Sequence, residues 1–128
     1  MWICLNDAFL SIVALPLEAD KPDFLSVRAR VKGDLERVFG DVRVTHTPLA
    51  DYAYRAEVFF GDVMDVIGAR IQAIDYTNFK ASVKEKDRHD AYLRCWVAMR
   101  DLQEKRLTKR KKKRLFTDRG LFDTRRGS

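Results

Sequence analysis

The sequence has little cysteine and no long apolar run. Its two cysteines, Cys4 and Cys95, lie far apart and show none of the short spacings of zinc or redox sites. We therefore expect both to be reduced, semi-buried thiols. No apolar stretch approaches the roughly 20 residues that a membrane-spanning helix needs. The first residues carry no basic flank and soon reach Asp7, which predicts neither a signal peptide nor a transit peptide and favours a cytoplasmic location.

The motifs of metal, cofactor and nucleophile chemistry are also missing. His46 and His89 are the only histidines, and neither has a cysteine or carboxylate at a recognised metal-binding spacing. There is no glycine-rich phosphate loop, and no serine lies in the Gly-x-Ser-x-Gly context of a nucleophile elbow. These absences predict no metal and no cofactor and favour a non-enzymatic protein. The remaining candidates for catalysis are polar residues that the sequence alone does not place in a common site: Asp7, Asp75, Tyr76 and Asn78.

Charge is divided unevenly along the chain. Residues 1–104 hold 14 Lys or Arg against 17 Asp or Glu, a net of −3, whereas residues 105–128 hold 11 against 2, a net of +9, and the two sum to +6. The 128 residues, of which 46% are hydrophobic, suffice for one core. We therefore predict a single α+β domain over residues 1–104 and a separate, flexible basic tail over residues 105–128.

Four segments have the composition of β-strands. Residues 8–14 are apolar and end at turn-forming residues, and residues 25–32 alternate between apolar and polar side chains. Residues 42–47 and 52–59 alternate in the same way, and the short connection between them predicts a hairpin. The pattern predicts an antiparallel four-stranded sheet with one face exposed to solvent.

Three helices are predicted from apolar residues at spacings of three and four. The first begins at Asp34, which is placed to cap it, and ends at Gly40. The second begins at Gly61 and is expected to pack on the sheet. The third follows Asp87, and we expect it to bury a stripe formed by Tyr92, Cys95, Trp96, Met99 and Leu102.

Two parts of the sequence resemble each other. Residues 27–31 match residues 54–58, and after one inserted residue the segment 33–39 matches 61–67. Each unit consists of a strand, a Gly-Asp pair and a helix, and each follows another predicted strand. This favours a ββα-ββα duplication with the helices on one face of the sheet. Chance similarity between two amphipathic units is the alternative.

The basic tail carries the clearest binding signal. Six consecutive cations repel one another and attract phosphates, so we expect nucleic acid or a ribonucleoprotein as partner, bound without sequence preference. The alternatives are a protein-docking tail, suggested by Leu115-Phe116 and Leu121-Phe122, and a solvated tail without function. The predicted contact residues are Lys105, Arg106, Lys109, Arg110, Lys111, Lys112, Lys113 and Arg114.

Two arginines inside the domain are a second candidate site. Arg28 and Arg55 occupy equivalent positions of the repeat, on the polar faces of their strands. If the duplication is real, the two guanidinium groups could bind phosphates or carboxylates as a pair. The alternative is an ordinary solvated sheet face on which Glu57 and Asp51 neutralise part of the charge.

The junction between the second and third helices is a third candidate site. A connecting loop that combines polar and aromatic residues is how many recognition surfaces are built, so we predict protein binding there. The alternative is a structural corner in which capping residues and ring packing turn the chain. The residues concerned are Tyr76, Asn78, Phe79 and Lys80.

Several of these segments resemble a family of small, functionally uncharacterised bacterial and phage proteins. The resemblance covers residues 1 to about 103 and is carried by residues 1–3, 6–14, 27–30, 51–56, 74–80 and 90–92, with Trp96 and Met99. It implies a domain boundary near residue 104 but no activity, and the chain departs from the family in its basic extension. A phage or mobile-element context implies a second function, an inhibitor that binds a host protein such as a defence-system component.

Together these observations predict a non-enzymatic binding protein. Its α+β domain would supply a specific surface, and its tail would add affinity for nucleic acid or a ribonucleoprotein. The alternative is a protein-interaction module. A four-stranded sheet leaves edges that a second copy could extend, so the sequence allows both a monomer and a homodimer.

Overall fold

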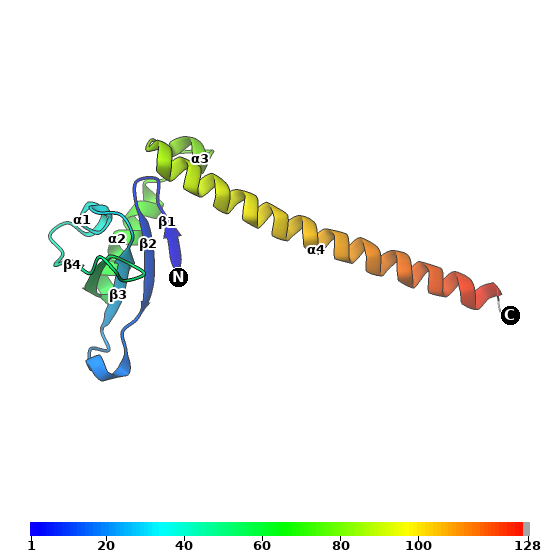
Figure 1. Ribbon diagram of the computed structural model, residues 1–128, viewed down its shortest axis with the longest axis horizontal. Helices are drawn as coiled ribbons and strands as arrows, with labels where there is room; N and C mark the ends of the chain where they lie inside the picture. The colour runs from blue at the N-terminus through cyan, green and yellow to red at the C-terminus, as the bar shows by residue number, and fades with distance from the viewer. Residues whose placement is uncertain (127–128) are drawn as a thin grey trace. The chain divides into compact units, whose positions relative to one another are not determined.

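The computed structural model describes the backbone of residues 1–126 and the side chains of residues 1–117 (Figure 1). The chain divides into two compact units after Arg88. The first unit, residues 1–88, contains a sheet and short helices. The second begins at His89 and, in its described residues, consists of one helix. No helix in the described part of the chain is long and apolar enough to cross a membrane.

The first unit is built on a five-stranded antiparallel sheet with the strand order β1-β2-β3-β5-β4. The strands are β1 (Trp2–Cys4), β2 (Phe9–Ala14), β3 (Phe24–Ala29), β4 (Thr45–His46) and β5 (Tyr54–Phe59). The predicted antiparallel α+β class is confirmed, but the prediction of four strands was wrong. The sequence did not indicate β1 because three residues are too few to show an alternating pattern. Of the strand predicted over residues 42–47, only the two residues of β4 are part of the sheet.

One face of the sheet carries the hydrophobic core. The register pairs Ile12 with Val27 and Val27 with Ala56. These side chains lie on the same face because paired residues of neighbouring strands share a face. All three are buried, and they belong to one cluster that also includes Leu10 and Val58.

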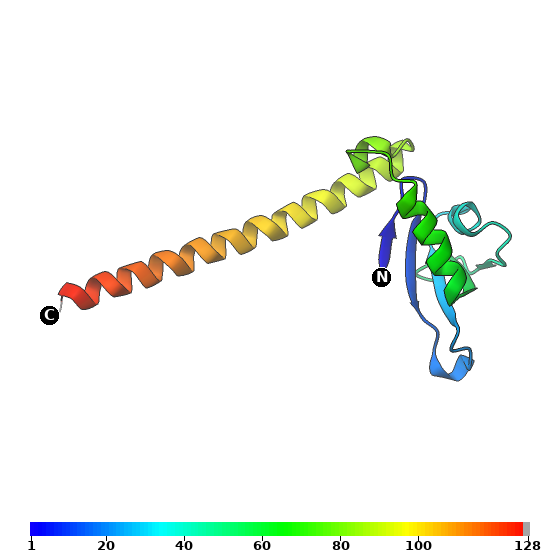
Figure 2. The same cartoon turned by 180° about the vertical axis from the view of Figure 1, so that it is seen from behind.

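Two helices complete this core. Helix α1 (Asp34–Phe39) contributes Leu35, and helix α2 (Phe60–Gln72), which Figure 2 shows lying along the sheet, contributes Val63 to the same buried cluster. Both helices therefore cover the same face, as the sequence predicted. The opposite face of the sheet is left without a helix from the first unit, and we call it the open face.

Asp34 forms a buried ion pair and does not cap α1, so its predicted capping role was wrong. Gly33, with φ of 92°, takes the N-cap position, and the side chain of Asp34 has no exposed surface. The carboxylate of Asp34 accepts hydrogen bonds from Arg88 at 2.7 and 3.0 Å and from the backbone N–H of Phe9 at 3.0 Å. A carboxylate removed from water needs such partners, because an unpaired buried charge is strongly destabilising.

A second, more exposed ion pair connects the turn after β1 to helix α2. The guanidinium of Arg70 donates to both carboxylate oxygens of Asp7, at 2.8 and 3.2 Å. Arg37 donates to the backbone carbonyl of the same aspartate. The turn is thereby tied to α1 and α2 by side chains far away in the sequence.

A short helix, α3 (Phe79–Ser82), was not predicted and lies just before the last helix. The side chain of Asn78 accepts a hydrogen bond from the backbone N–H of Ala81 at 3.3 Å and so caps α3. The prediction that Asn78 is a capping residue is confirmed. Four residues are too few to show a helical period, which explains why the sequence gave no sign of this helix.

Helix α4 (Lys86–Arg126) is continuous and begins two residues before the predicted position, so that Asp87 lies inside it. Residues 105–126, predicted as a flexible tail, have helical backbone in it. A separate domain that ends at residue 104 stays a prediction, because the division between compact units falls at residue 88. The pair Leu121-Phe122 lies outside the described side chains.

The apolar stripe predicted on this helix is mostly exposed, so the prediction that it is buried was wrong. Tyr92 is buried, but the side chain of Trp96 is 46% exposed and that of Met99 is 63% exposed. A lone helix cannot bury its own stripe, and α4 is the only helix in the described part of the second unit. Cys95 is also exposed, as is Cys4 on β1, which corrects the expectation of semi-buried thiols.

The predicted duplication stays a prediction. Both halves contain a strand followed by a helix, but the two helices begin differently. Gly33 is the N-cap of α1, whereas Gly61 lies inside α2, whose N-cap is Phe59.

Candidate nucleic-acid interface

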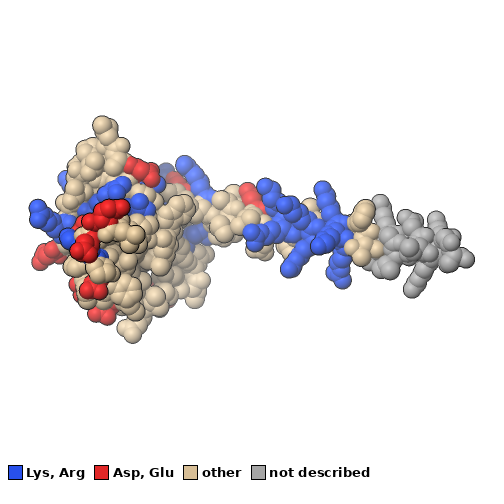
Figure 3. All heavy atoms as spheres, turned by 90° about the horizontal axis from the view of Figure 1, so that it is seen from below, with Lys and Arg blue, Asp and Glu red and all other residues tan. Residues whose placement is uncertain are grey.

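The basic segment of α4, residues 105–117, is the most strongly charged part of the described chain. It contains eight Lys or Arg residues and no Asp or Glu. All its side chains are exposed, and none of the eight cations forms an ion pair with a described carboxylate. Figure 3 shows the Lys and Arg atoms gathered around this length of the helix. The charge is therefore available to an external anion.

The helical backbone distributes these cations around the helix. Lys109 to Arg114 are six consecutive residues, and an α-helix completes a turn in about 3.6 residues. The six side chains therefore project in every direction around the axis. A polyanion could meet several of them from any side, which suits contact with phosphates more than recognition of a particular sequence.

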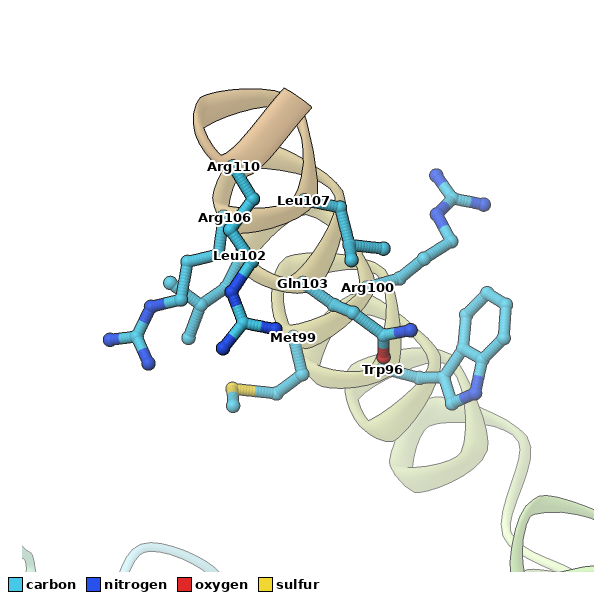
Figure 4. A pocket seen from close by; sticks show the side chains of 8 residues that line it. All are labelled: Trp96, Met99, Arg100, Leu102, Gln103, Arg106, Leu107 and Arg110. Carbon is cyan, nitrogen blue, oxygen red and sulfur yellow. The ribbon is translucent and has the colours of Figure 1, made fainter. Parts of the chain in front are cut away.

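The part of α4 that leads into and includes the start of the basic segment combines apolar and cationic side chains. Figure 4 shows Trp96, Met99 and Leu107 near three arginines, around a shallow hollow along the helix. The guanidinium of Arg100 lies 5.3 Å from the centre of the Trp96 ring, a cation–π contact. The stripe leads directly into the basic segment.

The open face of the sheet brings the two predicted arginines together. Ser11 pairs with Arg28, Arg28 pairs with Arg55, and Arg55 pairs with Thr45. Arg28 and Arg55 are thus direct neighbours on one face. Two like charges in such a position disfavour the sheet unless an anion or another partner compensates them.

The two carboxylates expected to neutralise these arginines are bound elsewhere. Glu57 accepts from Lys21 at 2.6 Å, and Asp51 accepts from Arg30 at 3.2 Å. Arg28 donates to the hydroxyl of Ser11 at 2.7 Å, and its Nε has no hydrogen-bond partner in the described part of the chain. Arg55 donates only to a backbone carbonyl, that of Tyr52, at 3.4 Å. Among the described residues, neither Arg28 nor Arg55 has a carboxylate partner.

Tyr52, from the loop before β5, covers the centre of the open face. The guanidinium carbons of Arg28 and Arg30 lie 4.3 and 4.1 Å from the centre of its ring. Burial alone would raise the pKa of the Tyr52 hydroxyl, but hydrogen bonds from Ser11, Trp2 and Arg30 outweigh it and lower that pKa below the usual tyrosine value. Indole and guanidinium groups can only donate, so they favour the ionised hydroxyl.

Exposed aromatic rings lie at two places on the open face. Trp2, which is 73% exposed, meets Phe9 edge-to-face at 6.2 Å. Phe24 and Phe59, which are 38% and 46% exposed, form another edge-to-face pair at 6.0 Å. Exposed rings beside unpaired arginines are typical of nucleic-acid recognition.

Next to the second pair of rings the surface is hollowed. The hollow has a volume of about 540 Å³ and takes its cations from Lys21, Arg43 and Arg55. Arg43 is exposed and lies just before β4, and no ion pair is found for it among the described residues. The remaining lining residues are Leu15, Pro16, Phe24, Ser26, Thr45, Ala56 and Glu57.

Sequence reasoning missed the aromatic part of this face, although the signal was present. Phe24 lies four residues before Arg28, and Phe59 lies four residues after Arg55. An even spacing along a strand places residues on the same face. Alternation could therefore have placed both rings with the arginines, whereas the position of Arg43 depends on how the connection before β4 folds.

The corner between α2 and α4 has an evident structural role. The rings of Tyr76 and Phe79 are half-buried and 5.7 Å apart, Lys80 is half-buried, and Asn78 is the cap of α3. These contacts explain the residue types through packing and capping. Protein binding at this corner stays a prediction.

The described residues show no grouping of three or more metal-ligating side chains. His46 stacks on Tyr54 with ring centres 4.7 Å apart, and His89 lies 3.6 Å from the carboxylate of Asp90. Comparison with family models, with curated proteins and with solved structures found no significant match to this chain. The arrangement of its own residues is therefore the basis for inferring function.

Proposed function

We propose that this protein binds nucleic acid, free or in a ribonucleoprotein, without catalysing a reaction on it, and that the basic segment of α4 supplies most of the affinity. The observation that carries this proposal is the set of eight exposed cations with no carboxylate among them. A regularly spaced polyanion is the partner that can engage many such charges at once, since each phosphate contact releases condensed counterions.

The rest of the chain supports the same assignment of roles. Residues 1–104 carry a net charge of −3, so the domain as a whole does not attract a polyanion. The long-range attraction must then come from α4. If about six of its cations contact duplex phosphates, the logarithm of the binding constant should fall with the logarithm of salt concentration at a slope of roughly −5.

The proposal is tested by removing charge while keeping the helix. A triple variant, Lys111→Gln, Lys112→Gln and Lys113→Gln, retains good helix-forming residues. Its affinity for a fluorescent 20-base-pair duplex should fall at every salt concentration tested by anisotropy. The salt slope should become less steep by up to about 2.7, because each phosphate contact contributes about 0.9.

A matched control changes the same three positions to arginine. Lys111→Arg, Lys112→Arg and Lys113→Arg keep the charge, so the salt slope should stay at the wild-type value. If the glutamine variant binds the duplex with unchanged affinity and slope, the basic segment is not the nucleic-acid-binding element and the proposal is wrong.

A further inference from the structure

The open face carries a second set of unpaired cations, separate in sequence from the basic segment. Arg28, Arg43 and Arg55 belong to three different parts of the first unit, and no described carboxylate pairs with them. The nearby Glu57 and Asp51 are already bound to other cations. An anionic partner would relieve the repulsion of the opposed pair Arg28 and Arg55.

The rings on this face restrict the kind of anion. Trp2, Phe24 and Phe59 are exposed, and each lies in an edge-to-face pair that holds its ring in place. A partner that fits must offer flat apolar surfaces as well as negative charge. Nucleic acid offers both, since every base has a stacking face and every linkage has a phosphate.

The arrangement further favours a single strand. A duplex stacks its bases on one another, so they cannot stack on protein rings without unpairing, whereas an unpaired strand leaves them available. The hollow beside Phe24 has a volume of about 540 Å³, within the range of small-molecule sites, and has guanidinium groups in its lining. It can accept one base with its phosphate.

We infer that the open face binds a single-stranded segment of nucleic acid, with a base stacked on Phe24 and phosphates held by Arg43 and Arg55. This inference rests on the proposed function and specifies which form of nucleic acid the sheet selects. The basic segment would attract any nucleic acid, and the open face would retain unpaired stretches.

The test compares full-length variants on two probes, a 12-nucleotide oligouridine and a 20-base-pair duplex, by fluorescence anisotropy at fixed salt. Phe24→Ala should weaken oligouridine binding roughly 5- to 100-fold, because base–aromatic stacking is a substantial contribution per base. Duplex binding should change less than about two-fold. Phe24→Trp, which keeps a stacking ring, should restore oligouridine binding.

Charge on the face is tested separately. Arg55→Gln should weaken oligouridine binding and make its salt slope less steep by about 0.7, the expected change for one phosphate contact with a single strand. Met64→Ala, which removes an exposed apolar side chain from α2, is the matched control and should leave both probes unaffected.

The outcomes separate this inference from the proposed function. If Phe24→Ala and Arg55→Gln bind oligouridine like the wild type, or lose duplex affinity equally, the open face is not a single-strand site, and a protein partner becomes the better explanation of its rings. That result leaves the role of the basic segment intact. Only unchanged duplex binding by the triple glutamine variant would remove that role. Thermal unfolding of each variant distinguishes a lost contact from a lost fold. Trp2→Ala, which removes a ring from the other aromatic pair, is measured beside them for the same purpose.

Discussion

The sheet unit and the basic segment of α4 differ in how they place charge. Apart from the arginines of the open face, opposite charges in the sheet unit meet: Asp34 with Arg88, Asp7 with Arg70 and Lys21 with Glu57. In the basic segment, like charges follow one another without a described counter-charge. Pairing a buried charge offsets its desolvation, so removing one partner of such a pair is destabilising. Charges left unpaired on a surface are compensated by water and salt ions or by an anionic partner, and the proposed function assigns them to such a partner.

The largest expected effect is on the buried pair. Arg88→Met should lower the free energy of unfolding by about 3–5 kcal/mol, because it leaves the fully buried carboxylate of Asp34 with only the half-exposed Arg37, at 3.1 Å, as a cationic partner. Urea unfolding measures this change. The double variant Arg88→Met with Asp34→Leu should recover part of the stability, since no charge is then buried. A cost below about 1 kcal/mol would show that Asp34 does not depend on Arg88.

The more exposed pair should matter less. The side chains of Arg70 and Asp7 are 28% and 36% exposed, so water screens their attraction. Arg70→Met should therefore cost about 1 kcal/mol in the same urea experiment. A cost as large as that of Arg88→Met would show that burial does not determine how much an ion pair contributes to the free energy of unfolding.

A pH-dependent effect is expected from the Tyr52 hydroxyl. Its pKa is lowered in the folded protein, so the folded state binds fewer protons than the unfolded state between the lowered pKa and the usual tyrosine value near 10. This contribution is fully present above the unfolded value and is lost as pH falls through the folded value.

The measurement compares the wild type with Tyr52→Phe. The difference in their free energies of unfolding should grow as pH rises through the alkaline range. The phenolate absorbance of the variant should show one tyrosine fewer that ionises below the usual tyrosine pKa. If the difference stays constant with pH, the hydrogen bonds to Tyr52 do not favour its ionised form.

The smallest effect on stability is expected in the basic segment. The triple glutamine variant at residues 111–113 should change the free energy of unfolding by less than about 0.5 kcal/mol, and any change should be stabilising, because like-charged neighbours on a helix repel. Thermal unfolding of this variant beside the triple arginine variant measures it. A large loss of stability would mean that these lysines serve the fold, which would undo the contrast between the two regions.

Sequence patterns predicted the parts of the molecule whose signal is local. A short apolar run indicated β2, alternation indicated β3 and β5, and a count of charges was enough to find the basic segment. Contacts between residues far apart in the sequence could not be predicted. Asp34 and Arg88 are 54 residues apart, and no sequence spacing indicates that they pair. The residues of β1 and α3 are too few to show a period.

The candidate sites show the same division. Arg28 and Arg55 could be chosen from their strand positions, but their direct opposition depends on a register that the sequence does not specify. The stripe of Trp96 and Met99 was recognised as a helical face, yet amphipathicity says nothing about what covers that face. Arg43 carries no local signal and joins the site only through folding.

The two outermost strands are the shortest in the sheet, with three residues in β1 and two in β4. A foreign strand that lined up along either border would gain only a few backbone hydrogen bonds, so lateral growth of the sheet from one molecule into the next is unfavourable. Under the proposed function, many copies would be brought close together on one nucleic acid. The short edge strands would keep neighbouring copies from pairing their sheets and aggregating.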